Sequence, residues 1–287
     1  MVKNNMILKM FLDLIALIII SFPLLAIKLW ASPYERGFFY DDSSLALPYK
    51  DQTISEALLA GLGFALMVAT ILIVEIIRGV KGKSVRDKYL CGSEIPGWVW
   101  ESYTAIGVFT FGAACQQLIV TVAKYVIGRL RPHFYDLCVP VPTSMEQVER
   151  DLGYVQNFTC TGPLANHNTM LDMRLSFPSA HSGFAMYCAI FFIMYIQVNA
   201  KWRGSKLMRH VAQFIIFLAA WYVGLSRVTD HMHHWSDVAV GFAAGAAFAI
   251  ITFVYIYKPK KYLARDSYET ERTSQPEFLP RPVLMRT

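Results

Sequence analysis

The sequence predicts an all-α fold, an integral membrane protein built as a bundle of six transmembrane helices. Of its 287 residues, 55% are hydrophobic and only 17% are charged, whereas about 25% of the residues in a soluble domain are charged. The hydrophobic residues gather in six runs, and Lys and Arg lie mostly between these runs. Because a helix needs about 20 apolar residues to cross a bilayer, the bilayer is the expected solvent of this chain.

The six expected spans share an apolar composition and few charges. They cover Ile7–Trp30, Ile54–Ile77, Tyr103–Tyr125, Ser182–Val198, Val211–Leu225 and Val238–Tyr257. The first lacks a small-residue cleavage site, so we interpret it as a span rather than as a signal peptide. We expect one membrane domain over residues 1–257, with a long outer loop at 126–178. The polar residues 258–287 are expected to form a flexible cytoplasmic tail.

Basic residues predict the orientation of the spans. Lys and Arg are concentrated at the N-terminus and after the second, fourth and sixth spans. The positive-inside rule places these segments, and both termini, in the cytoplasm. The connections after the first, third and fifth spans then face the lumen or the cell exterior, and we expect the plasma membrane. The net charge of +6 does not indicate nucleic acid, because no basic helix is interleaved with aromatic residues.

The third-to-fourth connection carries marks of an extracytoplasmic loop. It contains a sequon, Asn157-Phe158-Thr159, which predicts glycosylation at Asn157. Cys138 and Cys160 lie in the same loop and could form a disulfide in an oxidising compartment, although two loop cysteines need not pair.

The first cluster of chemically informative residues ends the third span. Lys124 and Arg131 are seven residues apart, so they share a helix face if the helix continues to Pro132. Two cations on one face could bind an anion. The alternative is that these long side chains simply reach from the helix end to the lipid headgroups.

The second cluster opens the fourth span. Pro178 and Ser179 form a plausible helix start with the serine as N-cap, and His181 then lies in the first turn. The free N–H groups and the dipole of a helix N-terminus attract phosphate. The alternative is an ordinary capped helix with a histidine at the membrane interface.

The third cluster lies between the fifth and sixth spans. His233 and Asp237 are four residues apart, the spacing of one helix face, and Arg227 adds a planar cation suited to phosphate. A carboxylate that holds one imidazole nitrogen leaves the other free to attack. The histidines at 231, 233 and 234 could instead bind a metal, but no HExxH pattern occurs. Helix-to-helix hydrogen bonding is a further alternative.

All three clusters lie at span ends on the same predicted side, so they can converge on one pocket. Together they supply cations, backbone donors and two imidazoles, which suits phosphoryl transfer. We therefore expect an active site at the extracellular or luminal ends of the third, fourth and fifth-to-sixth spans.

On these residues, the sequence resembles the type 2 phosphatidic acid phosphatase superfamily, and closely its animal lipid phosphate phosphatases. The superfamily pattern is K-x6-R-P, P-S-G-H and S-R-x5-H-x3-D. Residues 124–132 and 226–237 match the first and third motifs, and residues 178–181 match the second except that Ala180 replaces glycine. The segment Pro33-Tyr34-Glu35-Arg36-Gly37-Phe38-Phe39 also resembles the animal branch. The resemblance covers roughly residues 7–257.

The resemblance implies a catalytic set of His233, His181 and Asp237. His233 attacks phosphorus and forms a phosphohistidine, Asp237 supports its imidazole, and His181 protonates the leaving alkoxide and then activates water. The implied phosphate-binding residues are Lys124, Arg131, Ser179, the backbone at Ala180, and Arg227. No metal and no other cofactor is expected.

The implied substrates are phosphate monoesters of membrane lipids: phosphatidate, lysophosphatidate, sphingosine 1-phosphate and ceramide 1-phosphate. A sugar or polyprenyl diphosphate phosphatase is an alternative within the superfamily. A non-catalytic membrane protein that binds lipid phosphates is the alternative outside enzymology. The resemblance also allows a homo-oligomer. Glycine permits positive φ and close approach to a ligand, so Ala180 is tolerated if its position is already helical.

Overall fold

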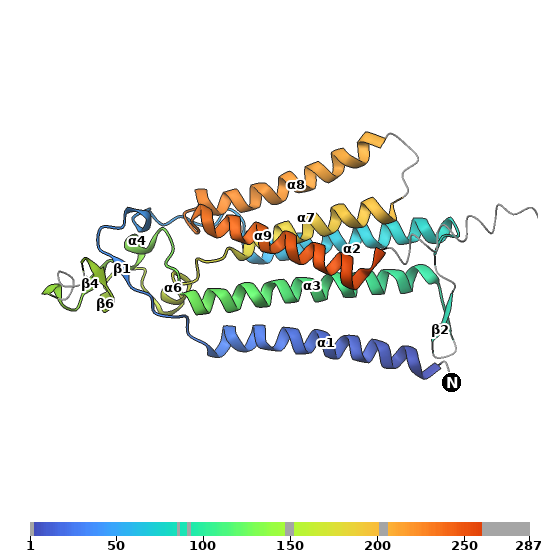
Figure 1. Cartoon of the computed structure of the whole chain (residues 1–287), viewed down its shortest axis with the longest axis horizontal. Coiled ribbons are helices and arrows are strands. Elements are labelled where there is room, and N and C mark those ends of the chain that lie inside the picture. The colour runs from blue at the N-terminus through green and yellow to red at the C-terminus, as the bar shows by residue number, and fades with distance from the viewer. Residues whose placement is uncertain (1–2, 85–86, 91–92, 147–151, 201–205, 260–287) are drawn as a thin grey trace, which may run out of the picture.

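Six long helices make up the bundle in the computed structural model, which describes residues 3–84, 87–90, 93–146, 152–200 and 206–259. They are α1 (Lys3–Trp30), α2 (Glu56–Val80), α3 (Gly97–Ile127), α7 (Ala180–Asn199), α8 (Lys206–Thr229) and α9 (Trp235–Ile251), the last continued by the π-helix η2 (Thr252–Tyr257). Each is long and apolar enough to cross a membrane. The predicted all-α, six-span fold is therefore confirmed, and Figure 1 shows the helices running along one long axis.

The helix ends follow local chemistry. Ser55 caps α2 by accepting a hydrogen bond from the N–H of Leu58. Ser179 caps α7 by accepting one from the N–H of Ser182, which confirms the predicted N-cap. At the other end of α3, Gly128 adopts a left-handed conformation with φ of 57°, and its N–H bonds to the carbonyl of Lys124. The helix therefore stops at Ile127, four residues before Arg131, so Lys124 and Arg131 do not share a helix face.

The helix α7 lies in the middle of the bundle and packs against α2, α3, α8 and α9. Its contact with α9 is close because small residues face each other: a side chain added at Gly245 would collide with the backbone carbonyl of Gly183. Phe109, Tyr187 and Phe191 fill the buried core between α3 and α7. This close packing brings the first residues of α7 next to the first residues of α9.

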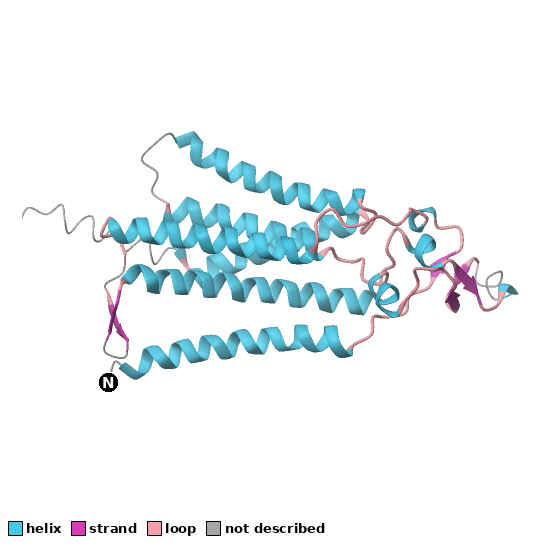
Figure 2. Ribbon diagram, turned by 180° about the vertical axis from the view of Figure 1, so that it is seen from behind, coloured by secondary structure: helices cyan, strands magenta, loops and turns pink. Residues whose placement is uncertain are grey.

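Short elements cover one end of the bundle, which we call the outer end. They are β1 (Phe38–Phe39), η1 (Ser43–Leu45), α4 (Phe134–Cys138), β4 (Pro140–Pro142), β5 (Tyr154–Val155), β6 (Phe158–Cys160) and α6 (His167–Asp172). We call the described residues of 31–55 and 128–179 the outer cap. Figures 1 and 2 show these elements gathered beyond the helix ends, opposite the N-terminus and the hairpin of β2 (Lys88–Leu90) and β3 (Ser93–Ile95).

The outer cap has a small core of its own. Antiparallel pairing joins β1 to β5 and β4 to β6, and buried side chains including Phe38, Leu130 and Phe134 pack between these strands and α4. Cys138 and Cys160 form a disulfide. The short strands were not predicted from the sequence. The cap holds the segment after α3 above the start of α7, where the candidate site lies.

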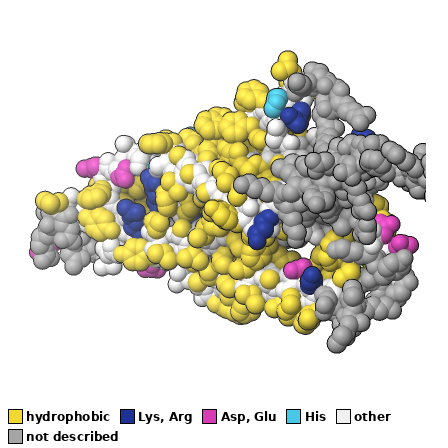
Figure 3. Space-filling model, turned by 45° about the vertical axis from the view of Figure 1, so that its right-hand side comes forward, with side chains coloured by type: hydrophobic (Ala, Val, Ile, Leu, Met, Phe, Trp, Pro, Cys, Tyr) yellow, Lys and Arg dark blue, Asp and Glu magenta, His cyan; other side chains and the backbone are white. Residues whose placement is uncertain are grey.

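The surface between the two ends is apolar. Hydrophobic side chains cover most of the middle of the face in Figure 3, and the exposed large hydrophobic residues lie mainly on α1, α2 and α8. This surface suits lipid contact. Asn157 is exposed in the turn between β5 and β6, where a glycan has room. The predicted tail falls outside the described residues, apart from residues 258 and 259.

Candidate active site

Three segments that are far apart in the sequence meet at the outer end. Backbone hydrogen bonds join the segment after α3 to the segment before α7, from Ser176 N–H to Arg129 O at 3.0 Å. Another joins the start of α7 to α9, from Ser179 N–H to Asp237 O at 3.1 Å. The three sequence clusters thus lie in direct contact. The motifs alone could place them only on the same predicted side of the membrane.

His233 lies in the turn between α8 and α9 and is 3% exposed. Its Nδ1 is 2.6 Å from the carbonyl oxygen of Ser176. A carbonyl can only accept, so Nδ1 carries the proton and Nε2 keeps its lone pair. Burial, together with the positive charges of Arg131 and Lys124, holds the pKa of His233 well below its usual range. The imidazole is therefore neutral at physiological pH, which is the state a nucleophile needs.

Asp237 supports His233 indirectly, which differs from the direct contact suggested by the sequence spacing. Its Oδ2 is 3.9 Å from His233 Nδ1, too far for a hydrogen bond. The α9 helix begins only at Trp235, so His233 precedes the helix and the four-residue helical spacing does not apply. Asp237 instead accepts from the hydroxyl of Ser176 at 2.6 Å and from Arg129 at 2.5 Å. Asp237 thereby holds Ser176 in place, and the carbonyl of Ser176 orients His233.

His181 is the second residue of α7 and is 6% exposed. Its Nε2 is buried and has no hydrogen-bond partner in the part of the chain that the structure describes. Ala180, just before it, is the first residue of the helix and is not among the residues with positive φ. The helix start therefore does not require glycine at this position for conformational reasons.

The predicted phosphate-binding cations differ in what they contact. Lys124 lines a cavity beside His181 and, within the described ranges, forms no hydrogen bond or ion pair. Arg131 and Arg227 are both buried and each already has a carboxylate: Arg131 pairs with Asp172 at 2.6 Å and Arg227 with Asp230 at 2.7 Å. Lys124 is thus the free positive charge of the group.

Several residues that complete the site had no assigned role in the sequence analysis. Asp230 lies three residues after Arg227, a spacing that could have indicated the pair. Thr53 donates to Asp230 at 2.6 Å from 177 residues away, and no local pattern indicates that contact. Arg129 lies inside the first motif and Ser176 lies two residues before the second, yet only the fold shows that both bond to Asp237.

A cavity of about 480 Å³ opens beside His181, among the outer halves of α1, α2, α3 and α7. Lys124, His181 and Asp172 form its polar end. Leu24, Leu59, Ala60, Phe64 and Phe184 form an apolar wall that extends into the hydrophobic part of the bundle. Lys28 and Glu56 also line it. The cavity can therefore accommodate a molecule with an anionic head and an apolar chain.

The histidines of the third cluster do not gather around a common point. His231 Nδ1 is 2.8 Å from the carbonyl of Pro48, His233 bonds to Ser176, and His234 Nδ1 is 3.3 Å from Asp237. Across the residues that the structure describes, no group of three or more His, Cys, Asp or Glu side chains could hold a metal ion.

Comparison with known proteins agrees with this geometry. The PAP2 superfamily model matches residues 105–261, a range that contains every residue of the three clusters. The chain is 39% identical to phospholipid phosphatase 2 of Mus musculus over 245 residues, 85% of this chain and 84% of the mouse protein. It is 37% identical to phospholipid phosphatase 1 of Rattus norvegicus over 247 residues, 85% of this chain and 83% of the rat protein. The chain therefore belongs to the PAP2 superfamily of phosphatases.

Proposed function

We propose that this protein hydrolyses phosphate monoesters of membrane lipids, namely phosphatidate, lysophosphatidate, sphingosine 1-phosphate and ceramide 1-phosphate. The observation that carries the proposal is the cavity beside His181. Its polar end holds a free lysine and a buried histidine, and its apolar wall reaches into the part of the bundle that faces lipid. A lipid can place its phosphate at the histidines while its chain stays at membrane depth. The names of the relatives, which are phospholipid phosphatases, support the same substrate class.

In the first proposed step, Nε2 of His233 attacks phosphorus and the bond from phosphorus to the lipid oxygen breaks. His181, which the bound phosphate dianion keeps protonated, gives its proton to the departing alkoxide. The attacking imidazole becomes positively charged, and the carbonyl of Ser176 stabilises that charge through the Nδ1 proton. The product of this step is a phosphohistidine and a free lipid alcohol.

In the second step, His181 accepts a proton from water, and the water oxygen displaces Nε2 from phosphorus. Phosphate leaves, and both histidines return to their starting protonation states. The unpaired Nε2 of His181 fits a group that passes a proton in both directions.

The negative charge on the transferred phosphoryl group is stabilised by Lys124 and by the free N–H groups at the start of α7. Ser179 caps the N–H of Ser182, and Ala180 contributes its own backbone N–H to the phosphate. Arg131 and Arg227 add positive potential from buried positions. We propose that their acid partners, Asp172 and Asp230, keep them in place. The reaction uses no metal in this proposal.

We further propose that the outer end faces the extracellular side of the plasma membrane and that both termini are cytoplasmic. The distribution of Lys and Arg supports this orientation. The disulfide between Cys138 and Cys160, together with the exposed sequon at Asn157, fits an oxidising compartment. Protease added to intact cells is expected to cleave a tag inserted in the outer cap. It is not expected to cleave a tag at either terminus.

The test is phosphate release from detergent-dispersed phosphatidate in excess EDTA. The wild type is expected to release phosphate, and His233→Ala is expected to lose at least about 1,000-fold in rate. A melting temperature of His233→Ala close to that of wild type shows that the loss is chemical. When the phosphate of phosphatidate carries the label, the wild-type protein is expected to become labelled. A label that survives base and is released by acid marks the phosphohistidine. Failure of the folded wild type to release phosphate contradicts the proposal and favours a non-catalytic lipid-phosphate-binding protein.

A further inference from the structure

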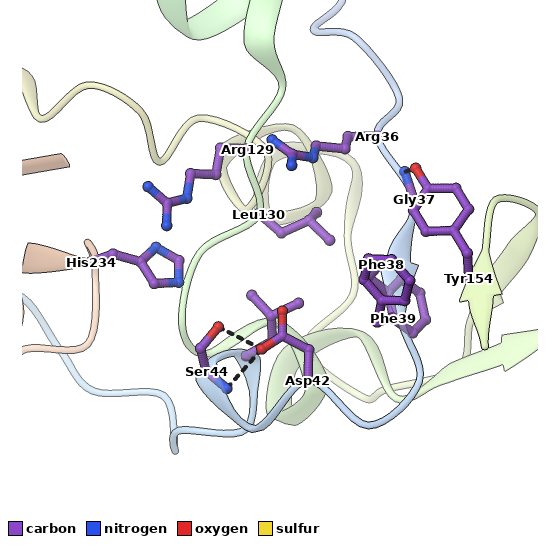
Figure 4. Close-up of a pocket in the computed structure, with 11 residues that line it drawn as sticks. Arg36, Gly37, Phe38, Phe39, Asp42, Ser44, Arg129, Leu130, Tyr154 and His234 are labelled. Atoms are coloured by element: carbon purple, nitrogen blue, oxygen red, sulfur yellow. Dashed lines mark hydrogen bonds between the residues drawn. The ribbon is translucent and has the colours of Figure 1, made fainter. Parts of the chain in front are cut away.

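A second cavity in the outer cap gathers basic side chains that do not contact the substrate in the proposed reaction. Its volume is about 140 Å³, and it lies between the first outer loop, the segment after α3 and the turn before α9. This volume is well above the roughly 10–15 Å³ that a cavity needs to hold a single water, so the cavity has room for a small anion. Figure 4 shows its lining, with Arg36, Arg129 and His234 on one side and Asp42 and Ser44 on the other.

Arg36 is the freest of these cations. Its side chain is exposed, and within the described residues its guanidinium has neither a hydrogen bond nor an ion pair. In Figure 4 it extends from the loop towards Arg129. The backbone behind it is fixed, because the N–H of Gly37 donates to the hydroxyl of Tyr154 at 3.1 Å. A positioned but unpaired guanidinium is a typical phosphate ligand.

Arg129 uses only part of its guanidinium. Its Nη1 donates to Asp237 at 2.5 Å and to the hydroxyl of Ser236 at 2.9 Å. Nε and Nη2 make no hydrogen bond to the part of the chain that the structure describes, and the side chain is 30% exposed. The unused donors are available to a ligand in the cavity.

The opposite wall carries a carboxylate whose hydrogen-bonding capacity is already partly used. Asp42 is the one carboxylate that lines the cavity, as far as the described residues show. Its Oδ1 already accepts from the backbone N–H of Ser44 at 3.0 Å and from the Ser44 hydroxyl at 2.6 Å. Arg129 is already paired with Asp237, so what favours an anion here is the unpaired guanidinium of Arg36 together with the unused Nε and Nη2 donors of Arg129.

We propose that this cavity is a second anion site, which binds phosphate between Arg36 and Arg129. The phosphate can be free orthophosphate, such as the product of the reaction, or the phosphate of a lipid headgroup. Both present the same oxygens to the two guanidinium groups, and the experiment below separates them.

Occupancy of this site is coupled to the nucleophile. Arg129 holds Asp237, Asp237 holds the hydroxyl of Ser176, and the carbonyl of Ser176 orients His233. A phosphate bound at Nε and Nη2 of Arg129 shares the guanidinium with Asp237 and draws it towards the cavity, so it weakens the support of His233. This coupling rests on the proposed function, whereas the binding of phosphate does not.

Equilibrium dialysis of the full-length His233→Ala protein in detergent, against radiolabelled orthophosphate, tests the binding. The substitution Arg36→Gln in this background is expected to remove one phosphate site per chain. Lys50→Gln is the matched control, because it removes a positive charge from the same outer loop at an exposed residue outside the cavity. Lys50→Gln is expected to bind as many phosphates per chain as the His233→Ala protein. The proposal is overturned if Arg36→Gln binds as many phosphates per chain as the His233→Ala protein, or if Lys50→Gln loses as many as Arg36→Gln.

The source of the phosphate is decided in nanodiscs that carry the same His233→Ala protein. Displacement of the Arg36-dependent orthophosphate by phosphatidate in the disc identifies a headgroup site. Retention of orthophosphate beside saturating phosphatidate identifies a site for the free ion. Either result supports an anion site at Arg36.

Kinetics test the coupling separately. In a protein with wild-type His233, added orthophosphate is expected to lower kcat as well as to raise KM, and Arg36→Gln is expected to remove only the effect on kcat. If the wild type shows no phosphatase activity, the dialysis result still stands, so failure of the proposed function is distinguishable from failure of the second site.

Discussion

Ser176 joins the proposed nucleophile to its carboxylate through two different atoms. Its hydroxyl donates to Asp237 and its carbonyl accepts from His233, both at 2.6 Å. The hydroxyl is the part that a substitution can remove without altering the backbone contact. Ser176 is therefore the residue at which the indirect support of His233 by Asp237 can be tested.

Removing the hydroxyl in Ser176→Ala is expected to lower kcat by about 10- to 100-fold with little change in KM. A hydrogen bond to a charged group contributes about 1.5–3 kcal/mol, which corresponds to this range if it acts mainly on the transition state. Steady-state hydrolysis of phosphatidate measures the effect. Ser44→Ala, a serine of the outer cap without a catalytic role, should retain the wild-type rate. A wild-type kcat in Ser176→Ala contradicts the indirect support.

Ala180 departs from the superfamily motif, and its helical conformation predicts that the departure costs little. Ala180→Gly is expected to change kcat/KM by less than about threefold, because no positive φ has to be relieved. Glycine in the first turn is expected to lower stability by at most about 1 kcal/mol. A rate gain of tenfold or more would show instead that the methyl group hinders the phosphate.

At the scale of elements, the early end of α3 decides where the first motif lies. The left-handed Gly128 turns the chain out of the helix, so Arg129 and Arg131 lie in an extended segment over α7. A Cβ at Gly128 would collide with the backbone carbonyl of Tyr34. This contact also ties the first outer loop to the end of α3.

Gly128→Ala is expected to destabilise the protein by about 1–3 kcal/mol, from the strained φ and the collision with Tyr34. It should also reduce activity, because the segment that carries Arg129 and Arg131 has to move. Thermal unfolding in detergent and phosphatidate hydrolysis measure the two effects. Gly107→Ala, in the same helix but with open space where the Cβ would lie, should unfold at or slightly above the wild-type temperature.

The elements differ in how far the sequence predicts them. Spans follow from apolar runs of bilayer length, which is a local property, and all six were found. The third span was predicted to end at Tyr125, two residues before the end of α3, but the condition that the helix continue to Arg131 fails, because Gly128 ends it first. The strands β1 and β5 pair across more than 100 residues, so no local pattern indicates them. The motifs named the site residues, but the contacts of Asp237 with Ser176 and Arg129 depend on that long-range packing.

At the scale of the whole molecule, the main cavity runs from the polar outer end into the bundle between α1 and α2. This path predicts that chain length matters for substrate binding. Ala60→Trp fills the apolar wall of the cavity. It is expected to raise KM for long-chain phosphatidate by about tenfold, since lost chain burial is worth about 0.8 kcal/mol per CH₂.

Hydrolysis of a short-chain phosphatidate by Ala60→Trp should be close to that of wild type, because its headgroup still reaches the histidines. Ala65→Trp places the same bulk on an exposed part of α2 outside the cavity and should alter neither substrate. Equal losses on both chain lengths in Ala60→Trp would contradict entry along this path.

The contact between Thr53 and Asp230 spans 177 residues, and Ser176 meets Asp237 across 61. The proposed site is therefore complete only after the first outer loop, the fourth span and the start of the sixth have all been inserted. A ribosome-bound chain that has translated four spans contains two of the motifs but not the third. During biosynthesis the protein thus remains without a finished site until its last span enters the membrane, so immature chains leave the lipids around them unaltered.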